Sequence, residues 1–428
     1  MYRIAIEQLK HWKLRKNRKP LIVRGARQVG KTWLMQEFAR TAYDKSIYIN
    51  FEDEEVLKHV FENDFDIKRI VASIELRFQE KVDDNTLLIF DEIQSARRGI
   101  TSLKYFQEKA PQLHVMVADS MLGISTTEST PVGKVDYLDL YPMTFEEYLL
   151  ALGKGDVVNS IRNHNWAVLQ AVRDHLVQDL KTYYYVGGMP EAVLSFVESR
   201  DYHEVRRIQN NILAGYDSNF AKHAPIEVVP RIRMAWNSLP NHLSHENKKF
   251  IYSTIRHGSR AKDFELALQW LIDSGLVIKV NRTKTGQMPL NAFEDTSAFK
   301  LFALDVGLLS AMNRTQADTL LRGNELFTTY KGALTEQYVA QHLRTFSDHL
   351  YYWSAENSTG EIDFLIQHHD TVFPIEVKAE ENLKSRSLRT FVAKYPQMHG
   401  IRLSMSDYRH QDWMDNMPLY AIGRHLFE

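Results

Sequence analysis

Short, strongly apolar runs punctuate the first 120 residues of the chain. They lie at residues 21–23, 86–90 and 113–118. Runs of this length without alternating polar residues predict strands that are buried on both faces, as in a parallel sheet. Residues 33–39 instead place apolar side chains at helical spacing and predict a helix directly after the first strand. The pattern therefore predicts an α/β fold built on a parallel sheet.

Helical periodicity dominates residues 166–240, which contain few apolar runs of strand length. Residues 264–280 then predict an amphipathic helix, a stop at Gly275 and a strand. These elements resemble the second half of a winged helix, with residues 281–288 as the wing. Winged helices contact DNA, bind other proteins or form inert parts of ATPase lids, and the fold does not decide between these roles. The cations that would meet DNA phosphates are Arg256, Arg260, Lys262, Arg282 and Lys284.

Composition and charge are those of an ordinary globular protein. The chain has 428 residues, which predicts about three domains at roughly 150 residues each. Its net charge of -1 excludes a histone-like coat for nucleic acid. The absence of Cys excludes disulfides, thiolate zinc sites and a cysteine nucleophile. Without an apolar signal-peptide core or an apolar run of membrane length, we expect a cytoplasmic protein with no membrane partner.

Charge is unevenly distributed despite this balance. Residues 1–50 hold twelve Lys or Arg against three acids, a net charge of +9. Within this stretch, G-x-x-x-x-G-K-T stands between the first predicted strand and helix, which is the context that a P-loop requires. Backbone N–H groups of such a loop face the phosphates, a Lys reaches the β- and γ-phosphates, and a Thr holds Mg²⁺. The predicted ATP-binding residues are Gly25, Ala26, Arg27, Gln28, Val29, Gly30, Lys31 and Thr32.

An acidic pair, Asp91 and Glu92, directly follows the apolar run at residues 86–90. Behind a P-loop, such a pair at a strand end is typical of a Walker B motif. We expect Asp91 to bind Mg²⁺ through a water and Glu92 to polarise the attacking water. Glu92 therefore favours an NTP hydrolase over a P-loop kinase for a small metabolite.

The third apolar run ends at Asp119 and Ser120. With the two motifs above, this polar strand tip resembles the AAA-plus superfamily, in which the first sensor residue contacts the γ-phosphate or the lytic water. The resemblance implies that Ser120 has this catalytic role. Asp119 departs from the pattern, since an extra carboxylate in this position would repel the γ-phosphate.

Two longer segments resemble signatures of one prokaryotic family: PVGKVDYLDLYPMTFEEYL at residues 131–149 and YYYVGGMPEAV at residues 183–193. Members join an AAA-plus-like ATPase to a C-terminal domain of unknown function, and most are described only as ATP-binding proteins. Lys134 stands where relatives often carry Arg as a finger acting in trans, which would imply a homo-oligomer, although Lys lacks the planar fork of Arg. Residues 187–190 resemble the turn that opens the helical lid of related ATPases, or are a plain Gly-Pro loop.

The C-terminal part of the chain predicts a helix followed by strands. Residues 331–340 predict the helix, and a strand begins at residues 351–353. Residues 361–366 alternate polar and apolar side chains as a half-buried strand does, and residues 373–378 predict the next strand.

Four polar side chains on these elements suggest a metal site. Because strand side chains repeat every two residues, Glu376 and Lys378 share a face, and an adjacent strand would place Asp363 beside them. Paired carboxylates repel unless a cation separates them, and oxygen ligands suit Mg²⁺ or Mn²⁺. With Glu336 on the helix, the set resembles the PD-(D/E)XK nuclease superfamily, which implies three acidic metal ligands and Lys378 as a catalytic residue. A charged β-hairpin is the alternative, and many domains of this class bind without cutting.

These patterns predict three domains. They are an AAA-plus-like P-loop ATPase domain at residues 1–165, a helical lid and winged-helix-like region at residues 166–320, and a PD-(D/E)XK nuclease-like domain at residues 321–428. The predicted function is a Mg²⁺-dependent ATPase coupled to a nuclease-like unit, with DNA or another nucleic acid as a partner. The alternative is a nucleotide-gated scaffold or interaction protein that cuts no strand.

Overall fold

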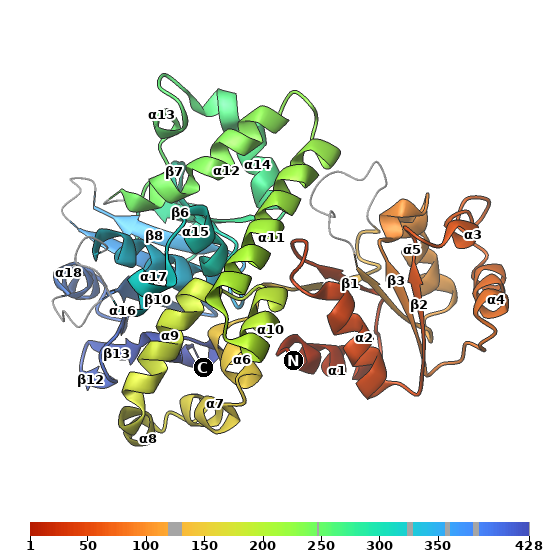
Figure 1. Ribbon diagram of the computed structural model, residues 1–428, viewed down its shortest axis with the longest axis horizontal. Helices are drawn as coiled ribbons and strands as arrows, with labels where there is room; N and C mark the ends of the chain where they lie inside the picture. The colour runs from red at the N-terminus through yellow and green to blue at the C-terminus, as the bar shows by residue number, and fades with distance from the viewer. Residues whose placement is uncertain (119–130, 246–247, 323–327, 356–359, 380–384, 428) are drawn as a thin grey trace. The chain divides into compact units, whose positions relative to one another are not determined.

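The computed structural model describes residues 1–118, 131–245, 248–322, 328–355, 360–379 and 385–427 (Figure 1). The chain divides into two compact units. The first consists of residues 2–141, and the second consists of residue 1 with residues 142–428. Among the residues described, no helix is both long enough and apolar enough to cross a membrane.

The first unit is built on a five-stranded sheet in the order β2-β3-β4-β1-β5, with every pairing parallel. The predicted parallel α/β fold is therefore confirmed. Strand β4 separates β1 from β3, so the carboxyl ends of these three strands meet at one edge of the sheet. The strands are β1 Leu21–Arg24, β2 Lys45–Asn50, β3 Thr86–Asp91, β4 His114–Ala118 and β5 Asp136–Asp139. The helices are α1 Ala5–Leu14, α2 Lys31–Ala42, α3 Glu55–Lys58, α4 Ile67–Phe78, α5 Gly99–Lys109 and the 3-10 turn η1 Ile93–Ser95.

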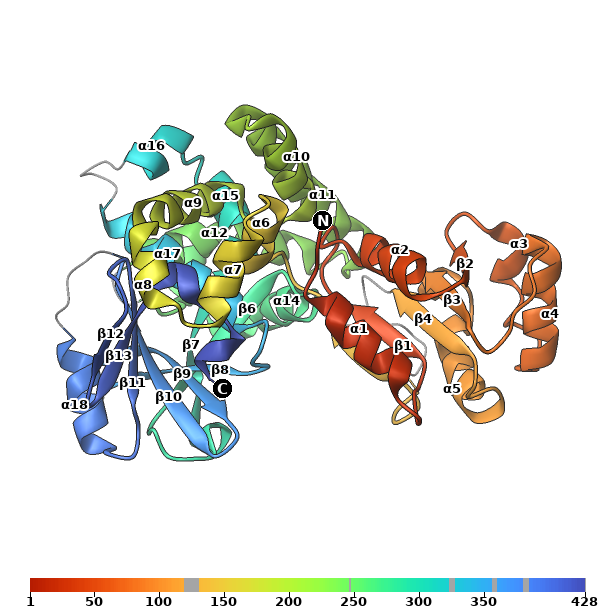
Figure 2. The same ribbon diagram turned by 90° about the horizontal axis from the view of Figure 1, so that it is seen from below.

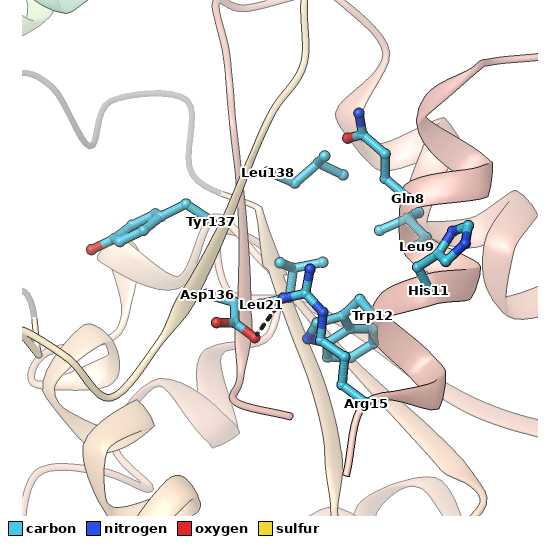
Figure 3. A pocket seen from close by; sticks show the side chains of 9 residues that line it. All are labelled: Gln8, Leu9, His11, Trp12, Arg15, Leu21, Asp136, Tyr137 and Leu138. Carbon is cyan, nitrogen blue, oxygen red and sulfur yellow. Dashed lines mark ion pairs between the residues drawn. The ribbon is translucent and has the colours of Figure 1, made fainter. Parts of the chain in front are cut away.

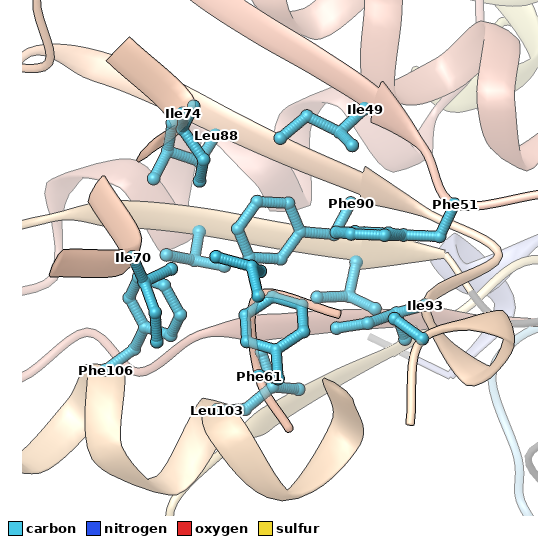
Figure 4. Close-up of a cluster of buried hydrophobic side chains, with 14 of the residues drawn as sticks. Ile49, Phe51, Phe61, Ile70, Ile74, Leu88, Phe90, Ile93, Leu103 and Phe106 are labelled. Carbon is cyan, nitrogen blue, oxygen red and sulfur yellow. The ribbon is translucent and has the colours of Figure 1, made fainter. Parts of the chain in front are cut away.

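A cluster of aromatic side chains fixes the end of β3 (Figure 4). Phe90 packs edge to face against Phe51, Phe61 and Phe106, with ring centroids 5.6, 6.2 and 5.8 Å away. Helices α4 and α5 close this core with buried Ile, Leu and Phe side chains. Each aromatic pair contributes about 0.5–1.5 kcal/mol beyond the area that it buries. Because Phe90 immediately precedes Asp91, this packing also holds the acidic strand end in place.

The second unit begins with a largely helical segment (Figure 1). The helices of the whole second unit are α6 Phe145–Ala151, α7 Gly155–Arg162, α8 Trp166–Ala171, α9 Arg173–Val186, α10 Pro190–Ser199, α11 Tyr202–His223, α12 Val229–Ser244, α13 Tyr252–Ile255, α14 Ala261–Asp273, α15 Val306–Met312, α16 Ala317–Arg322, α17 Thr328–Leu343 and α18 Arg386–Lys394. Short 3-10 turns are η2 Leu290–Phe293, η4 Leu419–Ala421 and η5 Arg424–Leu426.

Two signature segments of the sequence meet in this helical part. The Met143 N–H donates to the Gly188 carbonyl over 2.7 Å, and the Tyr183 hydroxyl donates to the Met143 carbonyl over 2.5 Å. A Cβ atom on Gly188 would lie 2.1 Å from that carbonyl oxygen, so only Gly fits. The Asp305 carboxylate accepts the Gly188 N–H over 2.6 Å. Hydrogen bonds between the signature residues described here therefore connect the start of α6 to α9 and to the turn before α10.

An eight-stranded mixed sheet completes the second unit (Figure 2). Its order is β12-β13-β11-β10-β9-β8-β6-β7, with parallel pairs β10/β11, β11/β13 and β6/β8. The strands are β6 Val277–Thr283, β7 Glu294–Ala303, β8 Leu350–Ser354, β9 Glu361–His368, β10 Thr371–Val377, β11 Gly400–Ser404, β12 Arg409–Gln411 and β13 Met414–Pro418. Helix α18 packs against this sheet through Leu388, Phe391 and Val392.

The two compact units divide the chain differently from the three predicted domains, and the three-domain division stays a prediction. The division falls after Tyr141 rather than after residue 165, because α6 packs against α9 and α10 of the second unit. The predicted boundary between residues 320 and 321 falls inside one sheet, since β6 and β7 pair with each other and β6 pairs with β8.

The segment predicted as a winged helix contains the expected helix α14 and an antiparallel pair of β6 with β7. Arg282, one of its predicted phosphate contacts, instead donates to Asp295 over 3.2 Å and to the Ser354 carbonyl over 2.9 Å. Arg256, Arg260, Lys262 and Lys284 are exposed. The winged-helix assignment itself stays a prediction.

Candidate nucleotide-binding site and C-terminal charge cluster

The predicted P-loop connects the end of β1 to the start of α2. Its turn needs left-handed backbone, with φ of 65° at Gln28 and 92° at Gly30, the residue that caps α2. Gly25 has a φ of 149°, and a Cβ atom there would lie 2.2 Å from the Leu140 carbonyl oxygen. The glycines at both ends of the motif therefore have a backbone reason to be there. The loop delivers its N–H groups to the N-terminus of a 12-residue helix, where anions bind favourably.

Lys31 is folded back over this loop. Its ammonium donates to the carbonyls of Gly25 and Ala26, both over 2.8 Å. The side chain is buried, with 7% of its residue surface exposed. This places a positive charge inside the turn that the motif forms, where a bound anion would meet it.

The Thr32 hydroxyl donates to the Asp91 carboxylate over 2.7 Å. This contact joins the first turn of α2 to the end of β3, 59 positions later in the chain. Asp91 is 5% exposed, and its Oδ2 atom also accepts the Tyr48 hydroxyl over 2.8 Å. Burial, followed by the hydrogen bond to Asp91, raises the pKa of Tyr48 well above its ordinary value, so this hydroxyl stays a donor. A hydroxyl and a carboxylate this close are suitable ligands for Mg²⁺, one directly and one through water.

Glu92 follows Asp91 in a left-handed conformation with φ of 50° and ψ of 42°. Such a backbone costs a residue other than Gly about 1 kcal/mol or more, and it recurs where a site needs a particular side-chain direction. The Gln94 side-chain amide donates to the Glu92 carboxylate. The Glu92 N–H donates to Asp91 over 3.1 Å, so the two acids are tied to each other.

Two arginines that sequence reasoning missed anchor the loop and its strand. Arg3 donates to the Val29 carbonyl of the P-loop over 2.8 Å and to the Tyr141 carbonyl over 2.6 Å. Arg24, at the end of β1, forms a bidentate ion pair with Asp139 on β5. Its two hydrogen bonds to the carboxylate are both 2.7 Å long. Buried Arg3 thus links the N-terminal segment to the loop, although no sequence motif marks that contact.

Two further residues were predicted for this unit, Ser120 and Lys134. Ser120, the predicted sensor, lies outside the described residues, which resume after β4 at residue 131. The strand that would carry it, β4, does lie between β1 and β3. Lys134 pairs with Glu108 of the same chain over 2.9 Å.

A small cavity of about 200 Å³ lies between α1 and β5 (Figure 3). Trp12, Leu21 and Asp136 line it, and Arg15 forms an ion pair with Asp136 over 3.8 Å. Leu21 and Asp136 are the first residues of β1 and β5, whereas the P-loop follows the last residue of β1. We therefore do not assign this cavity to the nucleotide phosphates.

In the second unit, the predicted acids on neighbouring strands lie side by side. Strands β9 and β10 are antiparallel, and their paired residues end with Ile375 opposite Phe364, directly next to Glu376 and Asp363. The Asp363 carboxylate accepts the Val377 N–H over 2.8 Å. Lys378 pairs with Glu376 over 3.1 Å. The structure thus pairs Lys378 with Glu376 and hydrogen-bonds Asp363 to the backbone of the strand that carries Glu376.

Glu336, the predicted acid on α17, is paired differently. Lys248 lies 2.6 Å from its Oε1 atom and Lys300 lies 3.8 Å from its Oε2 atom, and Lys300 also contacts Glu361. Burial opposes ionisation of Glu336, but the two lysines together hold its pKa below the ordinary value. Burial, and then the charge of Glu336, raises the pKa of Asp363. Lysine ammonium groups therefore supply the positive charge here.

The predicted metal site at Asp363, Glu376 and Glu336 is not assembled in this structure. Atom Oε2 of Glu336 and atom Oε2 of Glu376 are buried without a hydrogen-bond partner among the described residues, as a cation site would require. The ligand oxygens of the three acids do not, however, all lie within 4.8 Å of one another. Because Lys248 and Lys300 pair with Glu336, the residues present do not fit a shared divalent metal, and we derive no step through one.

Comparisons with protein families divide the chain into three matches. Residues 17–149 match an AAA domain, which confirms the predicted AAA-type domain over these positions. Residues 177–319 match a domain of unknown function, DUF8612. Residues 331–422 match another, DUF4143, which confirms the expected C-terminal domain of unknown function. No curated protein matches the chain.

Solved structures give distant likenesses. Caenorhabditis elegans PCH-2 is 13% identical, with a TM-score of 0.27, and the match covers 46% of this chain and 61% of that one. The Aeropyrum pernix ORC1 protein, solved in complex with DNA, is 12% identical, with a TM-score of 0.29 and coverage of 73% and 90%. The Thermotoga maritima RuvB Holliday junction branch migration motor is 12% identical, with a TM-score of 0.30 and coverage of 65% and 89%.

Proposed function

We propose that residues 2–141 bind ATP with Mg²⁺ and hydrolyse it. The observation that carries this proposal is the 2.7 Å contact between the Thr32 hydroxyl and the Asp91 carboxylate. It joins the two groups expected to hold Mg²⁺, from two motifs far apart in the sequence. The match of residues 17–149 to an AAA domain supports the same conclusion.

In this proposal each side chain has one task. The backbone of residues 25–30 and the start of α2 hold the phosphates, and Lys31 neutralises their charge. Thr32 and Asp91 would hold Mg²⁺, which draws charge away from the β- and γ-phosphates when it is bound. Glu92 orients the attacking water and accepts its proton.

Replacing Lys31 with Ala should weaken ATP binding. A hydrogen bond that involves a charged group contributes about 1.5–3 kcal/mol, so the Kd should rise about 10- to 100-fold. Titration with a fluorescent ATP analogue in the presence of Mg²⁺ measures this change, and circular dichroism checks that the sheet is retained.

The matched control for this binding test is Lys45→Ala. Lys45 is an exposed lysine of the same unit, paired with Glu80 and Asp83 over 3.8 and 3.4 Å. Its loss should leave the Kd unchanged. If the Lys31→Ala protein bound ATP as tightly as the wild type, the loop would not be a phosphate site and the proposal would fail.

For the second unit we propose a binding role without strand cleavage. Buried Lys300 and partly buried Lys248 neutralise Glu336 and Glu361, and the three predicted metal ligands do not converge. The exposed Arg256, Arg260 and Lys262 support nucleic acid as a binding partner, since phosphate contacts come from such side chains. Together with the ATPase, this describes a nucleotide-gated interaction protein.

Incubation with DNA tests the absence of cleavage. Duplex, single-stranded and branched DNA with Mg²⁺ or Mn²⁺ should remain intact with the wild-type protein. Cleavage that disappears in Glu376→Ala and Lys378→Ala proteins would contradict this proposal and establish a nuclease. Cleavage that persists unchanged in both variants would indicate a contaminating enzyme.

A further inference from the structure

Three potential metal ligands gather near the edge of the mixed sheet that β12 forms. None of them is a residue of the two candidate sites described above. They are His399, His410 and Asp415. One ligand atom from each lies within 4.8 Å of the other two. None of them belongs to a motif that the sequence analysis identified.

Strand register explains why these side chains meet. His410 on β12 lies directly opposite Asp415 on β13, so both side chains point to the same face. Asp415 also pairs with Ile401 on β11, and His399 stands two residues before Ile401 on that face. The ligands thus come from adjacent strands and the turn into β11, which hold them more precisely than a free loop would.

The distances are close to those of a coordination shell. His399 Nε2 lies 3.1 Å from Asp415 Oδ2, and His410 Nδ1 lies 2.7 Å from Asp415 Oδ1. In a tetrahedral zinc site with bonds of about 2.0–2.1 Å, neighbouring ligand atoms lie about 3.3 Å apart. Small side-chain rotations would therefore admit an ion between the three groups.

We propose that His399, His410 and Asp415 form a binding site for a divalent transition metal, with Zn²⁺ as the ion. Two imidazoles and one carboxylate suit Zn²⁺ and Co²⁺, whereas Mg²⁺ prefers an all-oxygen shell. The Tyr408 hydroxyl lies 3.4 Å from Asp415 and supports the carboxylate from outside the shell.

Exposure of the ligands is compatible with metal entry. The side chains of His399, His410 and Asp415 are 39%, 65% and 26% exposed. Water can therefore reach the site and complete four-fold coordination. Without metal, the same groups form exposed hydrogen-bonded pairs, which contribute little to the stability of a fold. Zn²⁺ would instead clip the three-residue strand β12 to the rest of the sheet.

Metal titration of the full-length protein tests the site. Protein stripped with a chelator and kept in Mg²⁺ should bind one equivalent of Zn²⁺ with a Kd in the micromolar range or tighter. Co²⁺ should give the visible absorption bands of a tetrahedral site. His399→Ala and His410→Ala should each weaken Zn²⁺ binding at least about tenfold, since losing a ligand costs no less than losing a residue that supports one.

Two further variants make the test specific. His59→Ala is the matched control, because His59 is also exposed and pairs with a single carboxylate, Glu62, over 3.0 Å. It should leave Zn²⁺ binding unchanged. The proposal is overturned if no Zn²⁺ binds, or if one equivalent binds equally well to both His399→Ala and His410→Ala. It is also overturned if Glu376→Gln rather than His410→Ala abolishes binding, since the ion would then occupy the carboxylate cluster.

Discussion

Replacing Glu92 with Gln is expected to reduce the kcat of ATP hydrolysis by about 10²- to 10³-fold while ATP affinity changes little. The amide has nearly the same shape as the carboxylate but cannot accept a proton from the attacking water, and general-base catalysis contributes on that scale. The Glu92 carboxylate accepts a hydrogen bond from the Gln94 side-chain amide, and the Glu92 N–H donates to Asp91, so the substitution changes the chemistry of a side chain whose backbone position is fixed separately. Phosphate release and nucleotide titration, measured on the same preparation, separate the two quantities.

The control for this variant is Glu55→Gln. Glu55 belongs to the same unit, its side chain is 76% exposed, and it forms an ion pair with neighbouring Lys58. Its turnover should equal that of the wild type. Unchanged hydrolysis in Glu92→Gln would refute the assignment of the general base. Transfer of phosphate to a metabolite rather than to water would restore the kinase alternative.

The core of the candidate nucleotide site could be predicted because its signals are local. The P-loop occupies eight consecutive residues between a strand and a helix, and Asp91 directly follows a buried strand. Each motif is readable without knowing how the strands are arranged. Their meeting at Thr32 and Asp91 then follows from a parallel sheet, whose carboxyl ends share one edge.

The partners that complete this site could not be predicted in the same way. Tyr48 reaches Asp91 only because β2 is the strand next to β3, and strand order leaves no mark in a short apolar run. Arg3 reaches the Val29 carbonyl because the N-terminal segment returns to the loop. A lone Arg near a chain end looks like any other surface residue in the sequence.

In the second unit, too, contacts between consecutive strands could be predicted from the sequence, but contacts between distant strands could not. Asp363 and Glu376 could be placed side by side because β9 and β10 are consecutive antiparallel strands. Lys300 could not be connected to them, since β7 precedes them by a long interval and is separated from β9 in the sheet by β6 and β8. One signal was available: Lys300 is the single charged residue within the buried run at residues 298–303. A charge inside such a run requires a buried partner.

Replacing Lys300 with Met should therefore lower the free energy of unfolding of the second unit by about 3 kcal/mol. This is toward the lower end of the range for breaking a buried ion pair. Lys300 is 1% exposed and contacts both Glu336 and Glu361. Met fills a similar volume but leaves those carboxylates with less positive charge. The loss stays moderate because Lys248 remains 2.6 Å from Glu336 and the Glu361 side chain is 30% exposed. Urea unfolding followed by circular dichroism measures the change.

Two comparisons decide whether charge is the cause. Lys279→Met removes a half-buried lysine from β6, where Lys279 faces Leu301 rather than an acid, and should cost about 1 kcal/mol or less. Adding Glu361→Gln to Lys300→Met should recover part of the lost stability, because it removes one of the carboxylates left uncompensated. If Lys300→Met unfolds at the same urea concentration as the wild type, the lysines do not neutralise the cluster. A metal-dependent nuclease would then regain support, since the carboxylates would be free to share another cation.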